Sequence, residues 1–123
     1  MTRKEIAQMI AGIGLPYAYD HFEESESPGN PPFICYTYSG SAHFIADGVV
    51  YQKIDDLEIE LYTDEKDFDL EEAVEDALDS KELVYSRDES YIDSEKMYMV
   101  TWTTSIILTK EENPNEEQGQ VQP

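Results

Sequence analysis

The spacing of apolar residues changes from two to three or four within one short stretch of this chain. From residue 57 to 62 the sequence LEIELY alternates, so Leu57, Ile59 and Leu61 share one side of a predicted strand, which is buried. The opposite, wet side carries Glu58, Glu60 and Tyr62. A helical stripe follows, made of Leu70, Ala73, Val74, Ala77 and Leu78. The fold must therefore combine a sheet with an amphipathic helix.

The helix in the second half of the chain has an acidic start and an acidic outer face. Asp69 is predicted to open it, with Glu72 three residues later. Negative charge in the first turn also suits the helix dipole. The face opposite the apolar stripe is predicted to be solvated and consists of Glu71, Glu72, Glu75, Asp76 and Asp79.

The remaining segments predict one more helix and several strands. Thr2 and Glu5 form a capping-box pattern before a helix whose apolar residues are Ile6, Met9, Ile10 and Ile13, and which Gly12, Gly14 and Pro16 end. Segments 16–22 and 33–40 read as strands, and Asp47-Gly48 predicts a hairpin within 43–52. A break is expected at Asp55-Asp56, and the final strand pair covers 83–94 and 96–108.

These elements predict an α+β fold with a mostly antiparallel sheet and two helices, in the order α-β-β-β-α-β-β. Residues 1–109 are expected to form a single domain. Residues 110–123 are polar and acidic, so they are expected to be a disordered tail. Because so few helices cannot cover the whole sheet, we expect a partner to cover part of its surface or edge.

The charge of the chain excludes several classes of partner. There are 28 Asp and Glu against 8 Lys and Arg, which gives a net charge of −20. Phosphate backbones and anionic membrane surfaces would be repelled. No segment has the length and apolarity of a membrane span, so no membrane association is predicted. Three interpretations remain: a surface that favours solubility, a DNA mimic that binds a basic partner, or a lining past which DNA moves without sticking.

The sequence provides no convincing reaction site. Residues 64–72, DEKDFDLEE, look superficially like a calcium loop but lack its glycine and its terminal glutamate. Cys35 and His43 are a conceivable thiol–base pair, but Cys35 lies in an apolar strand, where cysteine usually behaves as a small hydrophobe. Glu58 and Glu60 lie on the same side of one strand and do not face each other. We therefore predict no catalytic residue, no cofactor and no metal site.

The order of the motifs resembles a known family. The segments that match are His43-Phe44, Ala46-Asp47-Gly48, Tyr51, Ile59 to Asp64, Lys66-Asp67, Leu70-Glu71, and Tyr91 to Val100. Together, over roughly residues 30–104, they resemble the tail-terminator or tail-completion proteins of siphophages and prophages. Two features depart from that pattern: the extension after residue 101 and the Pro-rich loop at 25–32.

The resemblance implies a structural virion protein without catalysis or cofactor. Its subunits would close into a hexameric ring at the head-proximal end of the tail. The ring would cap the tail tube, stop its polymerisation and dock to the head connector, with DNA only as a non-sticking passenger. Assembly would take place in the host cytoplasm.

Seven residues are candidates for the oligomer or partner interface. The basic ones could form pairs between the acidic subunits, and the others lie on the wet side of the alternating strand: Lys53, Lys66, Arg87, Lys96, Glu58, Glu60 and Tyr62. Two other functions stay open, an acidic inhibitor or DNA mimic that binds a basic protein, and a small hydrolase or metal-dependent enzyme.

Overall fold

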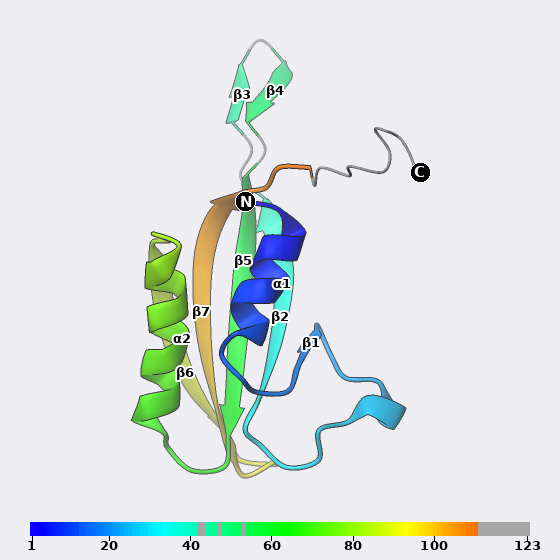
Figure 1. Ribbon diagram of the computed structural model, residues 1–123, viewed down its shortest axis with the longest axis vertical. Helices are drawn as coiled ribbons and strands as arrows, with labels where there is room; N and C mark the ends of the chain where they lie inside the picture. Colours follow the sequence, from blue (N-terminus) through cyan, green and yellow to red (C-terminus); the bar gives the residue numbers. More distant parts are fainter. Residues whose placement is uncertain (42–43, 47, 53, 111–123) are drawn as a thin grey trace.

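The computed structural model describes residues 1–41, 44–46, 48–52 and 54–110, which form two helices and seven strands (Figure 1). In chain order the elements are α1 (Arg3–Ala11), β1 (Tyr17–Tyr19), a short 3-10 helix (Glu24–Glu26), β2 (Phe33–Ser41), β3 (Phe44–Ala46), β4 (Val49–Gln52), β5 (Ile54–Thr63), α2 (Phe68–Ser80), β6 (Tyr85–Ile92) and β7 (Met97–Ile107). The expected tail at 110–123 lies outside the described residues except for Lys110. Five strands, and not three, separate the helices, because β3 and β4 form a sheet of their own.

The main sheet is mixed but almost wholly antiparallel, which confirms the predicted α+β class. Its strand order is β1-β2-β5-β7-β6, and only β1 and β2 run parallel. The alternating strand β5 lies in the centre, where Leu61 faces Ile34 of β2 and Val100 of β7. A central strand has neighbours on both sides, so its register fixes which side chains of the whole sheet share a face.

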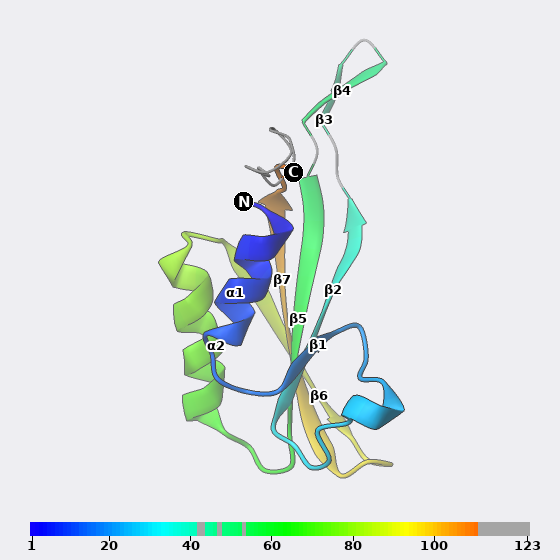
Figure 2. The same ribbon diagram turned by 45° about the vertical axis from the view of Figure 1, so that its right-hand side comes forward.

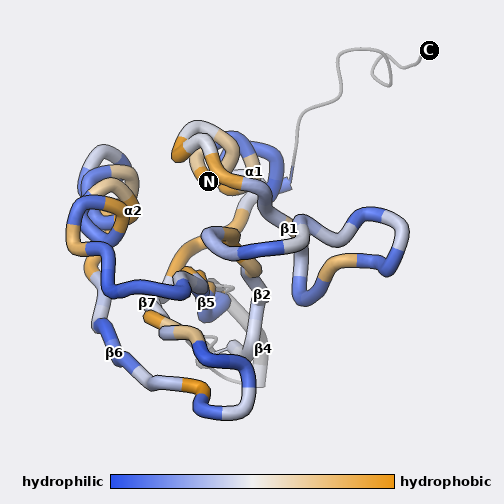
Figure 3. The backbone as a smooth tube through the Cα atoms, turned by 90° about the horizontal axis from the view of Figure 1, so that it is seen from below, coloured by the Kyte–Doolittle hydropathy of each residue, from blue (hydrophilic) through white to orange (hydrophobic). Residues whose placement is uncertain are grey.

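Both helices cover the same face of the sheet (Figures 1 and 3). The core lies between them and the sheet, and its fully buried side chains come from both layers: Ile6, Ile10, Ile34, Leu57, Ile59, Leu61, Val74, Leu78, Val100 and Trp102. The predicted buried sides of the central strand and of both helices are therefore confirmed. In the part of the chain that the structure describes, neither α-helix lies on the other face of the main sheet (Figure 3).

The first helix begins as predicted and the second begins two residues early. The Thr2 hydroxyl accepts a hydrogen bond from the Glu5 amide at 3.1 Å, and Glu5 accepts one from the Thr2 amide at 2.8 Å. In α2 the cap is Asp67, whose carboxylate accepts a hydrogen bond from the Leu70 amide at 3.1 Å. The prediction of Asp69 was wrong because both aspartates precede the apolar stripe and either side chain type can cap a helix.

The predicted break at Asp55-Asp56 is also wrong. Both residues lie inside β5, opposite Ile106 and Ser105, and the Ser105 hydroxyl donates a hydrogen bond to Asp56 Oδ1 at 3.0 Å. A hydrogen bond of this kind satisfies a carboxylate within a strand, which propensity alone does not reveal. The hairpin turn contains Gly48 with φ +74°, while Asp47 lies outside the described residues.

The β3–β4 hairpin stands beyond the end of the main sheet (Figures 1 and 2). It joins β2 to β5, and no other described element lies beside it in either view. Neither described helix has the length and apolarity that crossing a membrane requires.

Candidate protein interface

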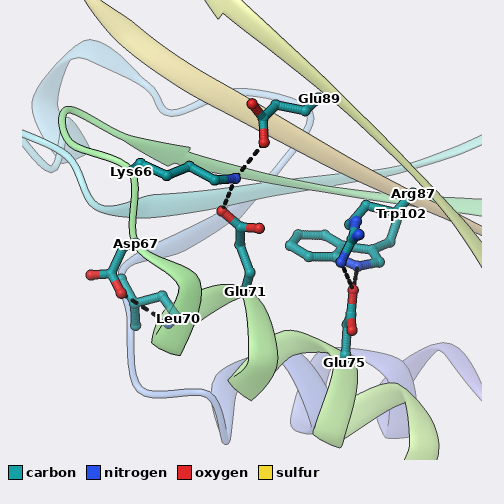
Figure 4. A network of polar contacts seen from close by, with 8 residues as sticks. All are labelled: Lys66, Asp67, Leu70, Glu71, Glu75, Arg87, Glu89 and Trp102. Atoms are coloured by element: carbon teal, nitrogen blue, oxygen red, sulfur yellow. Dashed lines mark hydrogen bonds and ion pairs between the residues drawn. The ribbon is translucent and has the colours of Figure 1, made fainter.

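A lysine flanked by two glutamates ties α2 to the edge strand β6 (Figure 4). Lys66 Nζ donates hydrogen bonds to Glu71 of α2 and to Glu89 of β6. It also lies 4.8 Å from the centre of the Phe68 ring, which suits a cation–π contact. Burial disfavours the charge on Lys66, but the bonds to Glu71 and Glu89 outweigh it, so the pKa of the ammonium group is raised.

A second carboxylate of α2 binds a buried indole (Figure 4). Glu75 Oε2 accepts hydrogen bonds from Trp102 Nε1 at 2.9 Å and from Arg87 Nη1 at 2.8 Å. Trp102 is completely buried in the core, so its N–H requires an acceptor. Glu75 therefore joins the core to the exposed edge of the sheet.

These contacts correct the prediction of a uniformly solvated acidic face on α2. Glu71 is only 5% exposed, and Glu75 is bound to the sheet, whereas Glu72, Asp76 and Asp79 are solvent-facing. Glu75 was mistaken for a surface residue because its partners Arg87 and Trp102 are distant in the sequence. Glu71 was mistaken because its partner Lys66 precedes the helix and lies outside the helical repeat that was used to assign its faces. The single arginine and the indole of the last strand pair are the sequence features that could have indicated such an interaction.

The structure separates the candidate basic residues into two groups. Lys66 and Arg87 are bound within the subunit and contribute to the contact between α2 and the sheet. Lys96 lies in the β6–β7 turn with its side chain 78% exposed and 4.0 Å from Asp93, so it is available to a partner. Lys53 lies outside the described residues.

The other three candidate residues share the sheet face that carries no helix. Glu58, Glu60 and Tyr62 alternate along β5, and the Tyr62 hydroxyl donates a hydrogen bond to Glu60 at 2.8 Å. Burial, assisted by this contact with Glu60, raises the pKa of the Tyr62 phenol. Among the described strand positions of this face there is no lysine or arginine, while Asp56 and Asp88 add to its negative charge.

An apolar pocket of about 360 Å³ lies at one end of this open face. The loop after β1 closes it from one side, where the Phe22 ring packs edge-on against Phe33 at 5.6 Å between centroids, and Phe33 stacks on Tyr62 at 5.0 Å. Further apolar lining comes from Ile92 and Met97, at the end of β6 and the start of β7. An apolar floor within a polar rim is the usual arrangement of a protein contact site.

Polar groups line the rim of this apolar pocket. They are Asp20, His21, Ser27 and Glu95. His21 Nδ1 lies 2.9 Å from Asp20, and the hydrogen bond to that carboxylate raises the pKa of the imidazole. The histidine is therefore held by its neighbours and is oriented as part of the rim. Nowhere in the described parts of the chain do three His, Cys, Asp or Glu side chains converge in a way that could hold a metal ion.

Cys35 also lines the pocket, and we expect its thiol to react slowly. It is 6% exposed, and burial raises its pKa to about 11. Since only the thiolate is nucleophilic, alkylation by iodoacetamide at pH 8 should be about a hundredfold slower than that of a free cysteine. Mass spectrometry of timed samples measures this rate. A rate equal to that of the unfolded chain in urea would contradict the buried placement. The partner considered for this thiol, His43, lies outside the described residues.

Comparison with known proteins identifies a fold and not a family. No family model and no curated protein matches the chain. Among solved structures, a chain from the virion of a native gene transfer agent particle matches with a TM-score of 0.55 and 15% sequence identity. The match covers 80% of this chain and 82% of the other. The class defined here is thus an α+β domain with one helix-covered sheet face, and a chain of a virion shares that fold.

Proposed function

We propose that this chain is a structural protein of a phage-like virion that acts without catalysis or cofactor. The observation that carries the proposal is the shared fold, because it extends over about four-fifths of both this chain and the virion chain. The finer role is that of a tail terminator or tail-completion protein. In this role a ring of subunits, six in number, caps the tail tube at its head-proximal end and docks to the head connector.

The surface of the subunit suits a ring through which DNA passes. Helices cover one sheet face, and the opposite face is free for neighbours or for the central channel (Figure 3). Heterologous contacts between identical subunits close into rings when the rotation between them is appropriate. The net charge of −20 repels phosphates, so DNA is a passenger and not a ligand.

Self-assembly should increase with salt. Copies that each carry a charge of −20 repel one another, and salt shortens the range of this repulsion to about 10 Å at 0.1 M and about 3 Å at 1 M. We expect light scattering after size exclusion to show monomers at low salt and a species with the mass of six subunits at high salt and high protein concentration. Negative-stain electron microscopy of that species should show closed rings.

The oligomeric state, together with two binding assays, separates the tail-ring proposal from the DNA-mimic alternative. A strict monomer under all conditions that also fails to bind purified tail tubes would contradict the role of a tail-ring subunit. Capture of one stoichiometric DNA-binding protein would instead favour a DNA mimic, for which the carboxylates Asp56, Glu58, Glu60 and Asp88 of the open face would be the contact surface.

A further inference from the structure

The β3–β4 hairpin lacks a supporting surface in its own subunit. Its strands, Phe44–Ala46 and Val49–Gln52, pair only with each other within the described residues. It extends past the end of the main sheet in both views (Figures 1 and 2). A two-stranded hairpin is at best marginally stable in water and requires further strands or a packing surface. The hairpin is therefore a segment that needs a partner.

The composition of the hairpin indicates what kind of surface it needs. Its strand residues read FIA and VVYQ, so six of the seven are apolar or aromatic and none carries a charge. In a chain with a net charge of −20, uncharged segments are the ones through which two copies can approach without strong repulsion. An apolar pocket or groove is the matching surface.

The same chain contains such a surface at the opposite end of its sheet. The pocket formed by Phe22, Phe33 and Tyr62 lies where β5 ends, whereas the hairpin enters β5 near Ile54. The strand between Ile54 and Tyr62 spans about 27 Å at the usual rise per residue. The strands of the hairpin have only 3 and 4 residues, so they are much shorter than this distance. The hairpin therefore cannot fold back into the pocket of its own subunit.

We propose that the β3–β4 hairpin of one subunit docks in the Phe22–Phe33–Tyr62 pocket of a second copy of this chain. The contact joins two different surfaces, so each subunit offers one hairpin and one pocket, and repetition produces a closed ring or an open filament. The inference rests on the proposed ring and specifies which surfaces form it. It also assigns a role to the loop after β1, which supplies Phe22 and Ser27 to the pocket.

Disulfide trapping tests this contact. Ser27 lies on the pocket rim and is exposed, and Cys35 is the chain's single cysteine. A chain with Cys35→Ser, Ser27→Cys and Val50→Cys has one thiol at the pocket and one in the hairpin. Mild oxidation with diamide at high salt should produce a ladder of covalent oligomers beyond the dimer, up to the ring size. Peptide mass spectrometry should show a bond between positions 27 and 50.

The matched controls contain only one of the new thiols. Cys35→Ser with either Ser27→Cys or Val50→Cys alone can form no species larger than a dimer, since each chain then has a single thiol. A ladder in the triple variant whose bonds join position 27 to 27 and position 50 to 50 would overturn the proposal. So would the absence of any ladder under conditions in which the wild-type chain forms rings, and in that case the proposed function would stand.

A charge placed in the pocket provides a second, independent measurement. Ile92→Lys puts an ammonium group at the apolar lining, whereas Val84→Lys makes the same change at a residue that is 88% exposed and outside the pocket. We expect the first variant to need at least tenfold more protein to assemble and the second to assemble like wild type. Circular dichroism of both variants checks that each is folded.

Assembly and tail-tube binding together show whether the pocket receives the hairpin of a second copy or a different protein. If Ile92→Lys forms normal rings but no longer binds tail tubes, the pocket receives a different virion protein, and the proposed hairpin contact is wrong. If the wild-type protein forms no rings and the triple variant forms no ladder, the contact between copies is wrong. Tail-tube binding by wild-type protein then decides whether the proposed function survives without it.

Discussion

Replacement of Trp102 by alanine is expected to lower the free energy of unfolding by about 3–5 kcal/mol. The indole is completely buried between the sheet and the helices, so its removal leaves a cavity in the centre of the core. Glu75 also loses one hydrogen-bond donor, while its contact with Arg87 stays. Urea denaturation followed by far-ultraviolet circular dichroism measures the change, because this variant lacks the only tryptophan of the chain.

Two milder variants separate the packing of Trp102 from its hydrogen bond. Trp102→Phe keeps an aromatic ring in the core but removes the N–H, and Glu75→Gln keeps an acceptor oxygen but removes the charge. If the two groups interact, the double variant should cost less than the sum of the single changes by roughly 0.5–3 kcal/mol. Strict additivity would show that the indole and Glu75 do not interact. A loss below about 1 kcal/mol for Trp102→Ala would show that the indole is not buried in the core.

The elements that the sequence predicts well depend on contacts close in the chain. The alternation around Ile59 fixes the two sides of β5 without knowledge of its neighbours. The capping box of α1 needs only Thr2 and Glu5, which lie three residues apart. In the same way, the apolar stripe that contains Val74 and Leu78 identifies the buried side of α2.

The parts that the sequence does not reveal depend on strand order. Glu75 resembles a surface residue until β6 and β7 bring Arg87 and Trp102 across from α2. Glu71 resembles one until Lys66, in the loop before α2, bridges it to Glu89 of β6. Their neighbours in the chain are exposed acids of the same type, so periodicity cannot tell them apart. The pocket is beyond local reasoning for the same reason, since it joins the loop after β1 to the β6–β7 turn.

The candidate interface shows how far residue type alone can lead. A lysine in a very acidic chain suggests a contact between subunits, yet Lys66 has two carboxylate partners in its own subunit. The alternation of Glu58, Glu60 and Tyr62 correctly places them together on one face of the sheet, and that face is open. Which partner covers this open face stays a prediction, because the answer depends on the surface of the partner as well as on this one.

Replacement of Lys66 by methionine is expected to cost about 2 kcal/mol, less than the ~3–5 kcal/mol typical of breaking a fully buried pair. Methionine keeps the length of the side chain but removes the charge, so Glu71, at 5% exposure, becomes a buried carboxylate without its cation. The loss is moderated because Lys66 is itself 23% exposed and Glu89 is 46% exposed. Urea denaturation of the wild-type protein and of Lys66→Met, in the same buffer at neutral pH, measures the difference in the free energy of unfolding.

Lys96→Met is the matched control, and pH supplies the decisive comparison. Lys96 is 78% exposed, so its replacement should change stability by less than about 0.5 kcal/mol. The pKa of Lys66 is raised from 10.5 in the folded protein, so its stabilising effect is complete below pH 10.5 and is lost as the pH rises through the folded value. The gap between wild type and Lys66→Met should therefore narrow in strongly alkaline solution, while Lys96→Met should follow wild type throughout. A gap that is already absent at pH 7 would show that Lys66 does not hold α2 against β6.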